Sequence, residues 1–235
     1  LIISYFFVSR SIRYGLALGA VLLASSFYSA LHGPVLHTER NFYGTLQINY
    51  DHIGPFYKMF HGTTLHGLQF INPNRKDEPL AYYHREGPFA QIFENYLSKP
   101  VSNSVAIIGL GIGSMLAYST PEQIWTFYEI DPAVIRMAQN SQYFTHVRDA
   151  RAKKVIIIPG DARINIGKAP EKEYGLIVVD AFSSDAIPVH LITKEAIDLY
   201  LSKLRKGGFL AFHISNKYLE LQRVIGDLAS SSGLT

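Results

Sequence analysis

The chain has 235 residues, 48% of them apolar and 17% charged, which allows one or two domains and excludes an intrinsically disordered protein. Its 22 basic and 19 acidic residues leave a net charge of +3, so we expect no nucleic-acid partner. The sequence has no cysteine, which excludes a disulfide scaffold, thiolate catalysis and cysteine-bound zinc.

The apolar N-terminal part of the chain, residues 1–31, predicts a transmembrane helix. No charged residue occurs from Tyr14 to Leu31, a length at the lower limit for crossing a hydrocarbon core of about 30 Å. Leu1–Val8 would be the end of an earlier span, and because the chain does not begin with methionine we expect it to be a piece of a longer protein. A buried helix and a secretory signal peptide are the alternatives.

Residues 37–97 are predicted to form a small β-rich region that is followed by a helix. Its β-like runs are Tyr43–Tyr50, Phe56–Phe60 and Leu65–Ile71. Turn residues separate these runs, which indicates an antiparallel hairpin or meander. The helical pattern covers Tyr82–Leu97, and Gly87-Pro88 should start the regular helix.

Residues 104–235 alternate between short apolar runs and helical patterns. The predicted strands are Val105–Ile108, Trp125–Glu129, Val155–Ile158, Leu176–Val179 and Phe209–Ile214. The predicted helices are Ser114–Ser119, Pro132–Gln139, Thr193–Leu204 with its end signalled by Gly207-Gly208, and one near Tyr218–Ala229. Continuously apolar strands separated by helices predict an α/β domain whose parallel sheet is covered on both faces.

Four of these strands in succession are followed by glycines or carboxylates, and open parallel sheets bind ligands at that edge. Gly109, Gly111 and Gly113 follow the first strand and open a helix, where a ligand can approach the backbone. Glu129 ends the second strand at a spacing that lets its carboxylate accept both hydroxyls of a ribose. Asp131 follows it and is predicted to cap the next helix.

The third and fourth strands are followed by acids of a different use. Asp161 could accept a hydrogen bond from an adenine amine, which favours an S-adenosyl ligand over a nicotinamide one. Asp180 and Asp185 share the loop after the fourth strand. Paired acids there suit an amine substrate, because an ammonium group must lose a proton before it attacks an electrophile. Capping of the next segment is the alternative role of Asp185.

On these residues the chain resembles the spermidine synthase family of aminopropyltransferases, which has the Rossmann-like class I methyltransferase fold. The resemblance runs from about Glu39 to Leu221. Its motifs are Arg40-Asn41-Phe42-Tyr43, Gly67-Leu68-Gln69, Asp77-Glu78, Tyr82–Glu86, Ile108–Gly113, Tyr128–Asp131, Gly160-Asp161-Ala162 and Asp180 with Asp185. The apolar N-terminal span and Asp180–Pro188 are similar to membrane-fused members, in which this domain follows a transporter-like helical bundle.

This resemblance implies transfer of an aminopropyl group from decarboxylated S-adenosylmethionine to an amine such as putrescine, with no metal. Asp180 would be the general base or amine anchor and Asp185 the second acid of the site. Gln69, Tyr83 and the adjacent His84 would contact the acceptor amine. The glycines, Glu129 and Asp161 would bind the donor, and a homodimer is possible.

Three departures from the family pattern concern the substrate half of the site. Ile112 stands where the family carries an acid that contacts the donor's amino tail, and Gly44 stands where it carries a glutamine. Ala181-Phe182 widen the spacing of the acid pair. A methyltransferase that uses S-adenosylmethionine therefore remains an alternative. So does a non-catalytic ligand-sensing domain of a membrane transporter-like protein.

Several smaller features complete the prediction. His61 and His66 lack a third ligand at metal-site spacing, and His213 ends the fifth strand, where packing is its favoured role. The antiparallel strand pair that closes the family's sheet is missing, so we expect a C-terminal truncation. The expected location is the inner or plasma membrane. Two loop arginines favour an outside domain, but a nucleotide-type donor favours a cytoplasmic one, which we expect.

Overall fold

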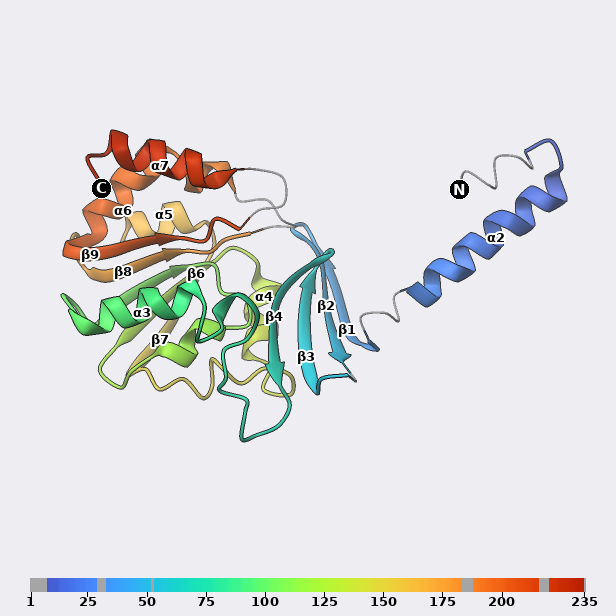
Figure 1. Ribbon diagram of the computed structural model, residues 1–235, viewed down its shortest axis with the longest axis horizontal. Coiled ribbons are helices and arrows are strands. Elements are labelled where there is room, and N and C mark those ends of the chain that lie inside the picture. The colour runs from blue at the N-terminus through green and yellow to red at the C-terminus, as the bar shows by residue number, and fades with distance from the viewer. Residues whose placement is uncertain (1–7, 29–32, 52, 183–187, 216–219, 235) are drawn as a thin grey trace.

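The computed structural model describes residues 8–28, 33–51, 53–182, 188–215 and 220–234. It contains a four-stranded antiparallel sheet next to a five-stranded parallel sheet that carries helices on both faces (Figure 1). The predicted α/β architecture, with a small antiparallel region before the parallel sheet, is confirmed.

The parallel sheet has the strand order β7-β6-β5-β8-β9. Its strands are β5 (Ser104–Ile108), β6 (Ile124–Glu129), β7 (Lys154–Pro159), β8 (Tyr174–Val179) and β9 (Leu204–Phe212). The chain runs outward from β5 to β7 and then returns to the other side of β5 to form β8 and β9. The order therefore reverses between β5 and β8, which is where open α/β sheets bind ligands.

Alternating side chains of these strands build two apolar layers. Val105, Ile107 and Trp125 face the cluster that includes helices α3 (Pro88–Ser98) and α4 (Pro132–Gln139). Ala106, Ile108 and Tyr128 face the cluster that includes α5 (Ala162–Gly167) and α6 (Lys194–Lys203). Because both faces are buried, the strands are apolar at every position, as the sequence indicated. The predicted bounds of α4, and the start of α3 after Gly87, are confirmed.

Two helix predictions in this region are wrong. The segment after the glycine loop is a short 3-10 helix, η3 (Ser114–Tyr118), rather than an α-helix. Helix α6 ends at Lys203, and Gly207-Gly208 lie inside β9 rather than at the end of a helix. A Cβ on Gly208 would lie 2.8 Å from the carbonyl oxygen of Gly175, so the glycine serves a close approach of two strands at a register irregularity.

The remaining elements cover the edges of this sheet. They are the 3-10 helices η2 (Ala81–Tyr83) and η4 (Val189–Leu191) and helix α7 (Leu221–Ser231). Helix α7 corresponds to the helix expected near Tyr218–Ala229, of which residues 218 and 219 lie outside the described part of the chain.

The antiparallel sheet is a meander in the order β1-β2-β3-β4. Its strands are β1 (Val35–Asn41), β2 (Gly44–Asp51), β3 (Phe56–His61) and β4 (Thr64–Phe70). The three predicted runs correspond to β2, β3 and β4, whereas β1 was missed because its sequence is polar and largely exposed. Leu46, Ile48 and Met59 are buried in the same cluster as Trp125, so this sheet packs against the larger one.

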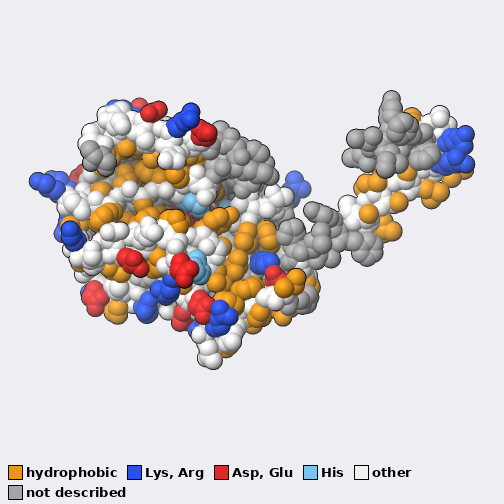
Figure 2. Space-filling model, in the orientation of Figure 1, with side chains coloured by type: hydrophobic (Ala, Val, Ile, Leu, Met, Phe, Trp, Pro, Cys, Tyr) orange, Lys and Arg blue, Asp and Glu red, His pale blue; other side chains and the backbone are white. Residues whose placement is uncertain are grey.

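Helix α2 (Ser11–Tyr28) lies apart from both sheets (Figure 1). Its apolar side chains are exposed, Ile12 to 79% and Leu16 to 70%, and form the band along the helix in Figure 2. Within the described ranges, no helix combines the length and apolarity needed to cross a membrane. The predicted transmembrane helix, membrane anchoring and membrane location are therefore wrong.

The physical reason for this correction is the length of the helix. The predicted span continued to Leu31, but the described helix ends at Tyr28. Its 18 residues extend about 27 Å at about 1.5 Å per residue, less than a hydrocarbon core of about 30 Å. The earlier span expected at Leu1–Val8 lies outside the described residues except for Val8.

Candidate active site

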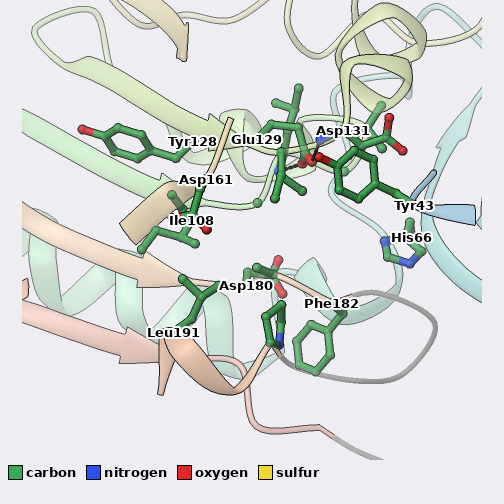
Figure 3. A pocket seen from close by; sticks show the side chains of 18 of the residues that line it. Tyr43, His66, Ile108, Tyr128, Glu129, Asp131, Asp161, Asp180, Phe182 and Leu191 are labelled. Carbon is green, nitrogen blue, oxygen red and sulfur yellow. Dashed lines mark hydrogen bonds between the residues drawn. The ribbon is translucent and has the colours of Figure 1, made fainter. Parts of the chain in front are cut away.

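The carboxyl ends of β5, β6, β7 and β8 surround one hollow with an empty volume of about 700 Å³, which we call the first hollow. Gly109, Gly111, Glu129, Asp161 and Asp180 all line it. Figure 3 shows the three carboxylates around this space, with side chains of the antiparallel sheet closing one side. The structure thus brings together most of the donor-binding residues that the sequence predicted.

The loop after β5 needs glycine at its first position. Gly109 has φ of +100°, and a Cβ there would lie 2.2 Å from the backbone oxygen of Asp180. The loop therefore passes directly over the end of β8. Gly111 also has a positive φ and lines the first hollow, whereas Gly113 contacts Val147 and is absent from the lining.

Glu129 is held at the end of β6 by backbone amides. Asp131 N–H donates to Oε1 and Leu110 N–H donates to Oε2, both at 2.9 Å. Burial raises the pKa of Glu129, and the two backbone hydrogen bonds oppose that rise. Each carboxylate oxygen has two lone pairs and uses one here, so the group can still accept two hydroxyl groups at a fixed position.

Asp131 caps helix α4, as the sequence predicted. Ala133 N–H donates to its Oδ1 at 2.8 Å. The same oxygen accepts a hydrogen bond from Asn41 Nδ2 at 2.5 Å. Asn41 ends β1, so this contact joins the antiparallel sheet to the rim of the first hollow, where Tyr43 also lies (Figure 3).

Asp161 has a local role that the sequence did not indicate. It caps helix α5, because Ile164 N–H donates to Oδ1 at 2.9 Å. Its Oδ2 lies 3.0 Å from Nε2 of His190, which also lines the first hollow. A ligand amine that reached Asp161 would therefore meet a carboxylate already oriented by a helix cap and by an imidazole.

Asp180 bonds two side chains that are distant in sequence. The Tyr83 hydroxyl donates to Oδ2 at 2.7 Å, and Nδ1 of His213 lies 2.6 Å from Oδ1. Burial, followed by the charge of Asp180, raises the pKa of Tyr83 well above its usual value. The phenol therefore stays protonated and remains a donor to the carboxylate. His213, expected to serve packing, was missed as a site residue; its position after β9 was the signal for it.

A second hollow of about 500 Å³ adjoins the first. Tyr82, Tyr83 and His213 line it. The residues that line both hollows are His66, Gly111, Asp180 and Phe182. Asp180 therefore stands where the two spaces meet, and a group bound in one can reach a group bound in the other past its carboxylate.

Two predicted acceptor residues line neither hollow. Gln69 is 1% exposed; its Nε2 donates to Thr145 Oγ1 and to the Lys76 carbonyl, and its Oε1 accepts from Thr145 N–H. Gln69 thus fastens β4 to two loops. His84 is exposed, with Nδ1 accepting from Glu86 N–H at 3.3 Å.

Two further positions qualify the predicted site. Asp185 lies outside the described residues. Ile112 is 1% exposed and belongs to the main apolar cluster, so the loop position where the family carries an acid is buried against β4. In the part of the chain that the structure describes, no three side chains of His, Asp or Glu are grouped as a metal site would need.

No known family model matches the sequence. A curated polyamine aminopropyltransferase of Vibrio vulnificus (strain CMCP6) is 38% identical over 119 residues, which are 48% of this chain and 38% of the Vibrio protein. The resemblance to the spermidine synthase family is confirmed. The alignment spans well under half of that relative, so the activity of the whole protein does not follow from it.

Two solved structures are similar to this spermidine synthase-like chain in fold. A probable spermidine synthase from Corynebacterium glutamicum ATCC 13032 matches with a TM-score of 0.61 and 18% identity, over 76% of this chain and 63% of that one. A spermidine synthase in complex with the transition-state analogue AdoDATO matches with a TM-score of 0.60 and 18% identity, over 83% and 64%. At that identity the likeness shows the fold, and this chain spans less than two thirds of either structure.

Proposed function

We propose that this chain is an aminopropyltransferase that binds decarboxylated S-adenosylmethionine in the first hollow and an amine such as putrescine in the second. The observation that carries the proposal is the position of Asp180 where the two hollows meet, with Glu129 and Asp161 around the first. The name of the Vibrio relative supports the same reaction class.

The residues around the first hollow fit the nucleoside part of such a donor. Glu129 would accept the two ribose hydroxyls with the lone pairs that its backbone partners leave available. Leu110, Val134 and Ala162 provide apolar surface for the adenine ring. Asp161 would accept from the exocyclic amine, with His190 beside it.

The chemistry requires an aligned amine that has lost a proton. Holding donor and acceptor in two adjoining hollows replaces a bimolecular encounter by an oriented one. The carbon next to the donor sulfonium would lie near Asp180, where the acceptor nitrogen would approach from the second hollow. Displacement is direct, so no covalent intermediate with the protein is needed.

Methyl transfer from S-adenosylmethionine is the second candidate, and Ile112 favours it. The family's acid at this position contacts the amino tail of the donor, but Ile112 is buried and apolar. A donor that does not depend on this contact would tolerate the change. The division into 1–31, 37–97 and 104–235, the role of Asp185 and a homodimer remain predictions.

Product analysis separates these functions. The protein is incubated with putrescine and either decarboxylated S-adenosylmethionine or S-adenosylmethionine, and nucleoside products are resolved by chromatography. Methylthioadenosine supports aminopropyl transfer, and adenosylhomocysteine supports methyl transfer. Donor binding without either product, across a panel of amines, would show a ligand-sensing domain instead. Glu129→Gln should abolish donor-dependent signals, while Glu122→Gln, at an exposed glutamate, should leave them unchanged.

A further inference from the structure

Asp180, the predicted base, is already engaged through both of its oxygens. Oδ2 accepts from the Tyr83 hydroxyl at 2.7 Å, and Oδ1 lies 2.6 Å from Nδ1 of His213. The Asp180 side chain is only 8% exposed. A carboxylate in this position is better placed to orient its partners than to meet an acceptor nitrogen directly.

The contact fixes which nitrogen of His213 carries the proton. An ionised carboxylate only accepts hydrogen bonds, so Nδ1 must be the donor. In the neutral ring Nε2 then holds a lone pair and no proton, which is the form that a general base requires. Asp180 therefore selects the tautomer of His213 that can accept a proton.

The ring is also held in place by its surroundings. The backbone N–H of His213 donates to the Val179 carbonyl at 2.9 Å, which continues the β8–β9 pairing beyond β9. Tyr82, Phe89 and Phe182 pack around the imidazole, with ring centroids 5.2, 5.5 and 5.0 Å from its own. His213 lines the second hollow but not the first. It is thus fixed on the acceptor side.

We propose that His213 is the catalytic base of the alkyl transfer and that Asp180 and Tyr83 are positioning residues for it; this inference rests on the proposed function. The acceptor ammonium gives one proton to Nε2 of His213. The nitrogen lone pair then attacks the carbon next to the sulfonium, and the carbon–sulfur bond breaks with its electron pair going to sulfur. The products are a secondary ammonium and a neutral thioether, and His213 releases its proton to solvent.

His213→Asn is the sharpest variant, because its amide N–H can replace Nδ1–H toward Asp180 while the base at Nε2 is removed. We expect kcat to fall by about 10²- to 10⁴-fold, while the donor Kd, measured by calorimetry, changes by less than about threefold. The matched control is His37→Asn at an exposed histidine, which should keep the wild-type kcat.

His213→Ala provides an independent test by chemical rescue. Added imidazole should restore part of the turnover in proportion to its concentration, with no gain for wild type or His37→Ala. A purely structural role predicts no rescue. If His213→Asn keeps kcat within about threefold, or if His213→Ala binds donor but imidazole restores nothing, this inference is overturned while the proposed function stands. If wild type forms no product with any donor and amine, the proposed function fails and this inference fails with it.

Discussion

The two hollows are built in different ways. In the first, Glu129 is oriented by backbone N–H groups, one of them two residues further along the chain, and Asp161 by the first turn of the helix it starts. In the second, Tyr83 reaches Asp180 across 97 residues and His213 across 33. The donor side depends on strand ends, whereas the acceptor side depends on side chains that only the tertiary fold brings together.

This difference teaches where the chemistry can change without a change of fold. Strand ends keep their geometry as long as the parallel sheet forms, so the first hollow should persist across substitutions elsewhere. The second hollow is lined by side chains from β4, η2, β8 and the segment after β9. Single substitutions there would alter acceptor chemistry with little effect on donor binding.

Asp180→Asn should have the largest effect, since Asp180 stands where the hollows meet. An asparagine has one accepting oxygen, so it cannot accept from both Tyr83 and His213. We expect product formation to fall by about 10²- to 10⁴-fold, with the donor Kd changed by less than about fivefold. Asp198→Asn on the exposed part of α6 is the matched control. A large loss of donor affinity would show that the two sides are not separable.

Glu129→Gln should affect the donor side alone. The amide cannot accept from both Leu110 N–H and Asp131 N–H, and it binds hydroxyl groups less strongly than a carboxylate. We expect the Kd for methylthioadenosine, measured by calorimetry, to rise about 10- to 100-fold, which corresponds to about 1.4–2.8 kcal/mol. An unchanged Kd would remove Glu129 from the donor site.

The pH dependence of the same affinity gives a second test of Glu129. Burial raises its pKa, so the carboxyl gains a proton as pH falls through that raised value, and donor affinity should fall. For folding the sign is opposite, because the folded state binds this proton more tightly than the unfolded chain. Its contribution to stability is present at low pH and is lost as pH rises through the folded pKa. Glu129→Gln should flatten both dependences.

Gly67→Ala tests the contact between the two sheets beneath the hollows. A Cβ on Gly67 would lie 2.6 Å from Cγ1 of the buried Ile112. We expect a loss of about 1–3 kcal/mol in the free energy of unfolding, measured by urea titration, and a smaller loss in an Ile112→Ala background. Gly226→Ala in α7, where a Cβ meets open space, should cause no loss. Equal losses in both backgrounds would exclude the steric cause.

Gln69→Ala should have the smallest effect on function. It removes three buried hydrogen bonds to Lys76 and Thr145, and we expect stability to fall by about 1–3 kcal/mol. The acceptor KM should remain unchanged, because Gln69 lines neither hollow. Gln142→Ala, at an exposed position, is the control. An acceptor KM raised more than tenfold would restore the acceptor role that the sequence predicted.

Sequence-based reasoning was accurate where the local chain dictates the outcome. The apolar runs located every strand of the parallel sheet, and Asp131 next to Pro132 predicted the cap of α4. It failed where neighbouring segments decide. Gly207-Gly208 resembles a helix end but meets the Gly175 carbonyl in the sheet, and α2 combines high apolarity with too short a described length.

The sequence by itself determined the α/β class, the strand ends and the three carboxylates that follow them, because periodicity and burial act within a few residues. Only the tertiary structure decided that Gln69 is a structural tie, that Ile112 is buried against β4, and that His213 meets Asp180. These outcomes depend on side chains tens of residues apart, which meet only when β9 is laid beside β8 and the antiparallel sheet packs on the parallel one.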